Sequence, residues 1–136
     1  MAGRRFLGRR PRWVWRCSAW TPTRARSSWR SRGVDDFTNP AGNVLGAFLA
    51  AMLYDTVGPT VLATVGPDEF QATKQLTVNF LRPARPGRVV GRGRIVRRDG
   101  DLRQVEASLI DERDELLATA TAVVQVIPLS EAREAV

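Results

Sequence analysis

The sequence contains one apolar run long enough to form a buried helix, from Val44 to Tyr54. The run is apolar all round, which is typical of a helix that is buried on every side. Asn43 supplies an N-cap and Gly58-Pro59 supplies a stop signal, so the predicted helix lies between them. These 11 residues are too few to cross a bilayer. The rest of the domain must therefore wrap around a single helix.

The segments that follow the helix have the periodicity and composition of β-strands. Residues 69–81 alternate between apolar and polar, and residues 88–98 are rich in Val and Ile before a turn at Asp99-Gly100. Residues 102–111 alternate again, and residues 116–127 form a long β-branched run. These patterns predict an α+β domain in which four antiparallel strands, in a meander, form a curved sheet around one central apolar helix. Another α+β roll would show the same periodicity.

The start of the chain differs sharply from the rest in charge. The first 33 residues hold ten arginines, all four tryptophans and no acidic residue, whereas the remainder holds 14 acidic and 11 basic residues. No helix or strand period recurs there. We therefore expect a disordered basic arm over residues 1–33, a domain over 34–129 and a short tail over 130–136. The strand that should precede the Asn39 loop has no pattern in residues 18–34, so the fold is expected to lack that strand or to build it poorly.

Four interpretations of the arm remain open. Arginine with interleaved tryptophan can bind nucleic acid through phosphate contacts and base stacking. An Arg- and Ser-rich segment without acids also resembles a transit peptide. The sharp break near Gly33 favours a third interpretation, upstream sequence read from a wrong start or frame. A disordered tail without function is the fourth, and we do not expect nucleic acid as a partner.

Cysteine and histidine usage limits the chemistry. Cys17 is the only cysteine, so no intrachain disulfide can form, and a reducing cytoplasm fits. The chain has no histidine, which removes the usual general base and the usual metal ligand. Arginines interrupt the apolar stretches of the arm, so no export signal is expected. We expect a cytoplasmic protein that holds no metal or cofactor and does not enter a membrane.

Three stretches, taken in order, carry a family resemblance. They are Asn39 through Ala47, the helix end Leu53-Tyr54-Asp55-Thr56, and Thr73 through Ala84, which contains Asn-Phe-Leu-Arg-Pro-Ala. Over residues 34–129 the chain resembles the small hotdog-fold acyl-CoA thioesterases related to the phenylacetate-pathway enzyme. The resemblance implies hydrolysis of an acyl-CoA thioester to the free acid and CoA. It also implies that the site lies at the interface of a homodimer, alone or within a dimer of dimers.

The resemblance also assigns roles to residues. The Gly46 N–H and the Asn39 side chain would polarise the thioester carbonyl, since a helix N-terminus offers free N–H groups to an oxyanion. Thr73, from the neighbouring subunit, would hold water or the catalytic acid. The residues expected to contact the substrate are Leu45, Ala47, Asn79, Arg82, Pro83 and Arg85, with Arg88 and Arg92 close enough in sequence to meet the CoA phosphates.

At two site positions the chain departs from the family pattern. Leu45 stands where the family has His or Gln, and Tyr54 stands where it has the catalytic acid, with Asp55 one residue later. One residue along a helix means a rotation of about 100° and a rise of about 1.5 Å, so Asp55 projects from a different face. A tyrosine with a pKa of about 10 is a poor base at neutral pH. We therefore expect weakened catalysis; the alternative is a non-catalytic hotdog protein that binds acyl-CoA or an acyl carrier.

Overall fold

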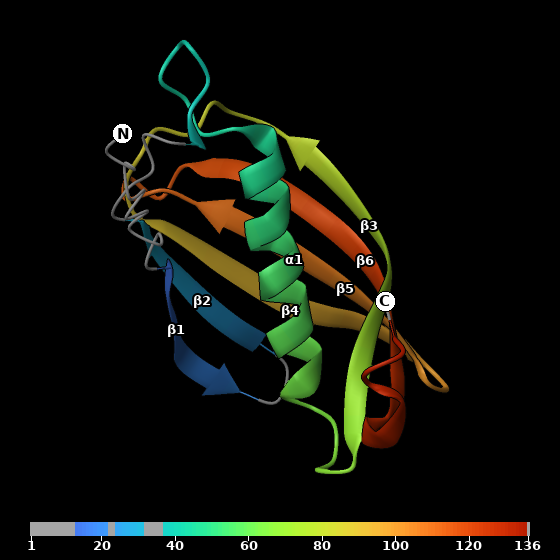
Figure 1. Ribbon diagram of the computed structural model, residues 1–136. Coiled ribbons are helices and arrows are strands. Elements are labelled where there is room, and N and C mark those ends of the chain that lie inside the picture. The colour runs from blue at the N-terminus through green and yellow to red at the C-terminus, as the bar shows by residue number, and fades with distance from the viewer. Residues whose placement is uncertain (1–12, 22–23, 32–36, 136) are drawn as a thin grey trace, which may run out of the picture.

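The computed structural model describes residues 13–21, 24–31 and 37–135 as one antiparallel sheet with a single α-helix across one face (Figure 1). The strands lie in the order β1-β2-β4-β5-β6-β3. This is the predicted α+β hotdog architecture, a curved sheet around one helix. The elements are β1 (Trp13–Thr21), β2 (Arg24–Ser31), α1 (Gly46–Leu62), β3 (Glu69–Phe80), β4 (Val89–Asp99), β5 (Leu102–Ile110), β6 (Leu116–Pro128) and the 3-10 turn η2 (Leu129–Glu131).

The helix is longer than the sequence predicts. It begins at Gly46, after an N-cap at Leu45 rather than Asn43, and it continues through Pro59 to Leu62. The prediction that Gly58-Pro59 ends the helix is wrong. A proline inside a helix removes only its own N–H bond and crowds one carbonyl. Here the turns on both sides of Pro59 are held by tertiary packing, since Val57 and Val61 are completely buried.

The helix is also not buried on every side. Its buried face carries Leu49, Leu53, Val57 and Val61, which pack against the sheet. The opposite side is exposed and carries Ala47, Ala51, Tyr54 and Asp55. Alanine counts as apolar in the sequence pattern but exposes little apolar area to water, so the pattern alone overestimates how much of the helix is buried. These exposed residues run along the helix from its N-terminus to Tyr54 and Asp55.

The four predicted strands exist with bounds within one residue of the prediction, but they do not form a meander. β4, β5 and β6 are consecutive neighbours, whereas β3 pairs with β6 and not with β4. Residues 81–88 join β3 to β4, which is too long for a tight hairpin and long enough to pass the ends of the intervening strands. Along this path Leu81 and Arg82 donate N–H bonds to the Leu117 carbonyl, at 2.9 and 3.1 Å.

Two strands form within the arm. β2 pairs antiparallel with β4, from Arg24 opposite Arg94 to Trp29 opposite Val89, and β1 pairs with β2. The sequence predicts a strand that is missing or poorly built, and the structure contradicts the first alternative, since residues 13–21 and 24–31 form strands. Strand pairing uses backbone N–H and C=O groups, and the edge of β4 offers an unpaired row of them to any extended segment. Composition and alternation do not detect such pairing. The remaining arm residues lie outside those that the structure describes.

The core lies between the helix and the sheet. The largest completely buried apolar side chains come from both layers: Leu53, Val57, Val61, Val105, Leu109 and Val124. Gly93 in β4 lets the two layers approach closely, because a Cβ there would overlap the Thr60 hydroxyl and lie 3.3 Å from the Thr56 carbonyl oxygen. Among the described residues, no helix is both long and apolar enough to cross a membrane.

Candidate active site

The Asn39 loop is tied together by its own side chain. Asn39 Oδ1 accepts the N–H groups of Ala41 and Asn43, at 3.0 and 3.1 Å, and the Asn39 N–H donates to the Asn43 carbonyl at 2.8 Å. Val44 then donates to the Ala84 carbonyl at 2.8 Å, which fixes the loop to the β3–β4 connection. Among the described residues none accepts a bond from Asn39 Nδ2. The loop therefore holds the side chain by its oxygen and leaves its amide donors available.

The N-terminus of α1 is uncapped. Leu45 makes no side-chain cap and no acidic residue lies in the first turn. The Leu45 carbonyl accepts the N–H groups of Phe48 and Leu49, at 2.9 and 3.4 Å. Within the part of the chain that the structure describes, the N–H groups of Gly46 and Ala47 meet no acceptor. Two donors at the positive end of a helix can receive an oxyanion.

Tyr54 and Asp55 both lie on the exposed side of the helix. Tyr54 lies seven residues, about two turns, after Ala47, so it lies on nearly the same face of the helix as that free donor, and Asp55 follows it by one residue. The Tyr54 residue is 41% exposed. Asp55 also lies on the surface, yet partial burial raises the pKa of its carboxyl above the ordinary value. Both residues are therefore exposed, about 100° apart around the helix.

Thr73 lies in β3, where its hydroxyl is 3.2 Å from Gln71 Oε1 of the same chain. The Gln71 amide nitrogen in turn lies only 3.0 Å from where a Cβ of Gly58 would stand. Gly58 is one helical turn after Tyr54, so Gln71 is a polar group against the helix one turn beyond the candidate acid position, and sequence reasoning missed it. Lys74, which breaks the apolar pattern of β3, falls at an irregularity of register between Thr73 and Gln75 and is exposed.

Phe80 is a second residue that sequence reasoning missed. It ends β3, and its ring atoms Cε1 and Cζ lie 3.3 Å from where a Cβ of Gly46 would stand. The neighbouring Asn79 is exposed. The only signal for Phe80 in the sequence was its position beside Asn79. Its contact with the helix depends on where the end of β3 lies relative to α1.

The predicted substrate-binding residues of the β3–β4 connection differ in exposure and in whether their side chains have a partner. Arg82 is exposed, but its Nη1 donates to the Leu116 carbonyl at 3.0 Å, so the guanidinium is turned to β6. Ala84 is buried and anchors the connection, and Pro83 and Arg85 beside it are exposed. Arg85 has no hydrogen bond or ion pair with another described residue. Of Arg82 and Arg85, Arg85 is therefore the predicted cation that is free to reach a ligand.

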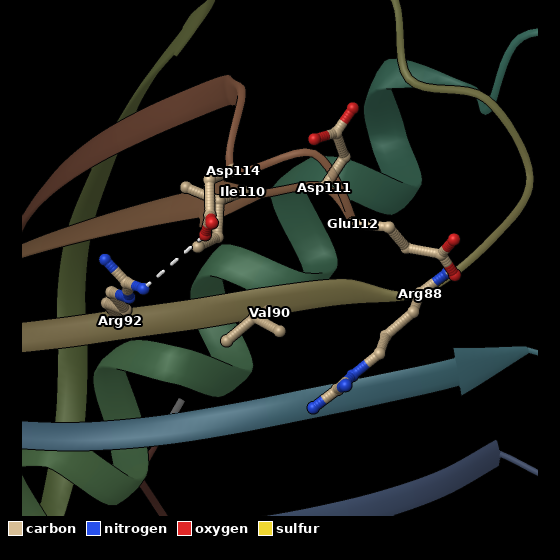
Figure 2. Close-up of a pocket in the computed structure, with 7 residues that line it drawn as sticks. All are labelled: Arg88, Val90, Arg92, Ile110, Asp111, Glu112 and Asp114. Carbon is tan, nitrogen blue, oxygen red and sulfur yellow. Dashed lines mark hydrogen bonds and ion pairs between the residues drawn. The ribbon is translucent and has the colours of Figure 1, made fainter.

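A shallow groove of about 390 Å³ lies where β4 meets the β5–β6 turn (Figure 2). It is lined by Arg88, Val90, Arg92, Ile110, Asp111, Glu112 and Asp114. Arg92 is 4.0 Å from the Asp114 carboxylate, and the backbone N–H of Arg88 donates to Glu112 Oε1 at 3.0 Å. Since Val89, Gly91 and Gly93 face the helix, the alternating Val90 and Arg92 point to the other side of the sheet. The two arginines thus lie beside three carboxylates, away from the helix N-terminus, and do not give the groove a net positive charge.

Comparisons with known proteins agree with this geometry. The family model described as the acyl-CoA thioesterase N-terminal domain matches residues 34–125. A phenylacetic acid degradation-related protein from Ralstonia eutropha JMP134 is 34% identical, with a TM-score of 0.74 and 83% of each chain covered.

Two further solved structures share the fold at low identity. A Streptococcus mutans protein bound to acetyl CoA is 17% identical, with a TM-score of 0.74 over 85% of this chain and 90% of that one. The Escherichia coli PaaI protein from the phenylacetic acid degradation operon is 11% identical, with a TM-score of 0.69 over 76% of this chain and 72% of that one. No curated protein matches the sequence. The chain belongs to the acyl-CoA thioesterase N-terminal domain family and is a hotdog-fold hydrolase of the thioesterase type.

Proposed function

We propose that the chain hydrolyses acyl-CoA thioesters at the N-terminus of α1, and that this copy does so slowly. The observation that carries the proposal is the pair of N–H groups at Gly46 and Ala47, which meet no acceptor among the described residues and lie at an uncapped helix end. The fixed Asn39 side chain lies in the loop that leads into this end and has free amide donors. Donors aimed at a developing oxyanion typically contribute about 10²- to 10³-fold to the rate.

The chemistry needs a water and a base in addition to these donors. The water oxygen attacks the thioester carbonyl carbon while a base takes one of its protons. The negative charge that develops on the carbonyl oxygen meets the Gly46 and Ala47 N–H groups, the C–S bond breaks, and CoA leaves as a thiolate. A positioned general base contributes about 10²- to 10⁴-fold, and Tyr54 at the family's acid position is a poor one. Asp55 is the other candidate, since a raised carboxyl pKa strengthens it as a base.

We further propose that the site is completed in a homodimer, alone or as a dimer of dimers. β3 pairs with β6 on one side, and among the described strands no other pairs with its second edge. An unpaired edge of 12 residues is a surface that natural sheets cover. A second copy that covers it would bring a partner's Thr73 and Asn79 close to the helix. Arg85, which is exposed and unpaired among the described residues, is our candidate for the CoA phosphates.

A second function has a specific observation in its favour. Leu45 and Tyr54 replace a polar residue and an acid of the family pattern, and both are exposed, at 40% and 41%. The same fold with these substitutions would bind acyl-CoA or an acyl carrier without turning it over.

One experiment separates the two functions. Release of CoA would be measured over acetyl-, hexanoyl-, decanoyl- and phenylacetyl-CoA, beside calorimetric binding of the S-hexyl thioether of CoA, which cannot be hydrolysed. We expect binding together with slow hydrolysis of at least one thioester. Binding with no release above the uncatalysed rate would establish the binding protein instead. Failure to bind the thioether and to release CoA would exclude both functions.

The dimer has a separate measurement. Multi-angle light scattering at micromolar concentration should give about twice the monomer mass, or four times for a dimer of dimers. A monomer mass throughout the concentration series would remove the shared site, because Thr73 and Asn79 would then come from the same chain as the helix.

A further inference from the structure

Phe80 occupies a position that the proposed chemistry does not explain. Figure 1 shows the end of β3 beside the N-terminal end of α1. Two atoms of the Phe80 ring lie 3.3 Å, and a third lies 3.7 Å, from where a Cβ of Gly46 would stand. The ring therefore lies against the residue whose N–H is a candidate oxyanion donor. Such a close approach depends on the missing side chain of Gly46.

The ring is not enclosed by its own chain. Phe80 is 56% exposed although it is a large aromatic residue at the end of a strand. Leu45, directly before Gly46, is 40% exposed, and Leu81, directly after Phe80, is 50% exposed. An open apolar surface of this kind beside free hydrogen-bond donors is typical of a ligand site.

The same surroundings offer little charge. The first turn of the helix, residues 46–49, contains no charged side chain. The nearest cation along the chain, Arg82, directs its guanidinium to the Leu116 carbonyl at 3.0 Å. A carboxylate that lay against the Phe80 ring would lose water and would not meet the Arg82 guanidinium, while Arg85, the free cation of the β3–β4 connection, is our candidate for the CoA phosphates. An apolar group would instead bury area against the ring, which is favourable by about 25 cal/mol per Å².

We propose that Phe80 is a specificity-determining residue, whose ring forms with Leu45 an apolar wall at the helix N-terminus that selects uncharged, apolar acyl groups. This inference rests on the proposed thioester site and names its substrate class. Leu45 adds to the selection, because a His or Gln at this position would offer hydrogen bonds to a polar acyl group. The acyl group lies along the exposed ring while its carbonyl oxygen meets the Gly46 and Ala47 donors.

The test compares two CoA thioethers of equal chain length by calorimetry, which needs no turnover. One is S-hexyl-CoA and the other is S-(5-carboxypentyl)-CoA. The wild-type chain should bind the hexyl compound at least about tenfold more tightly, since the carboxylate loses water without finding a cation. Phe80→Ala should reduce this preference to about threefold or less, whereas Phe80→Leu, which keeps an apolar side chain, should retain most of it. Leu129→Ala is the matched control, since Leu129 is 49% exposed and lies in η2.

The outcomes are distinct. Equal affinity of the wild-type chain for the two thioethers, or a preference that survives Phe80→Ala unchanged, would overturn the inference and leave the thioester site in place. A chain that binds neither thioether nor CoA itself would instead overturn the proposed function. A preference that Phe80→Ala and Leu129→Ala reduce equally would show a general loss of structure and would also overturn the role of Phe80.

Discussion

Asn39 and Gly46 show what a motif can predict at the scale of single residues. Both were selected from the order and spacing of residues 39–47, and the structure places Asn39 in the loop that enters the helix and Gly46 at its first residue. Phe80 and Gln71 were not selected, although each lies within 3.3 Å of a position that a Cβ on the helix would occupy. Their contacts depend on where β3 lies relative to α1, and periodicity within a strand does not contain this information.

Substitutions at Tyr54 and Asp55 test which of the two positions carries the catalytic acid. Tyr54→Asp would restore a carboxylate at the family's acid position and should raise turnover of an acyl-CoA by at least about tenfold. Asp55→Asn should change turnover little, because Asp55 lies about 100° further around the helix. Steady-state kinetics of both variants would decide between the positions. Lost activity in Asp55→Asn together with unchanged activity in Tyr54→Asp would identify Asp55 as the base, in agreement with its raised pKa.

At the scale of elements, the sequence predicts the strands well and the helix poorly. The bounds of β3 to β6 follow from alternation and turn residues, which are local signals. The passage of the helix through Pro59 and the pairing of β3 with β6 both depend on tertiary contacts. The buried Thr60 illustrates this, because its hydroxyl donates to the Thr56 carbonyl at 2.7 Å while it packs against Gly93. The Gly58-Pro59 stop signal in the sequence contains no information about such packing.

Gly93→Ala tests the contact between the helix and the sheet. The new Cβ would overlap the Thr60 hydroxyl and approach the Thr56 carbonyl, so the helix must shift. Overpacking of this kind typically costs about 1–3 kcal/mol of unfolding free energy. Gly66→Ala is the control, since a Cβ there would meet only the Glu69 carboxylate at 3.5 Å. Urea denaturation should show a lower midpoint for Gly93→Ala alone; equal midpoints would mean that the layers have room for a methyl group.

At the scale of the whole molecule, the arm is the main difference between expectation and structure. The family match begins at residue 34, so β1 and β2 extend the sheet beyond the matched region. Because β2 pairs with β4 from Val89 to Arg94, deletion of residues 1–33 should leave that edge of the sheet unpaired. We expect the truncated chain to melt at a lower temperature and to aggregate more readily than the full chain. Identical melting curves for the two chains would show that the arm contributes nothing to the stability of the sheet.

The claim that the loop and the helix N-terminus stabilise an oxyanion is tested most directly by Asn39→Asp. The new side chain keeps an oxygen for the Ala41 and Asn43 N–H groups but replaces the amide donor with a negative charge. The control is Gln104→Glu, the same change of charge at an exposed position of β5. The measurement is kcat for the acyl-CoA that the chain hydrolyses best, with a thermal melt of each variant. We expect Asn39→Asp to lower kcat by about 10²-fold with an unchanged melting temperature, and the control to retain its rate. A kcat equal to that of the wild type in Asn39→Asp would show that the loop does not stabilise the oxyanion.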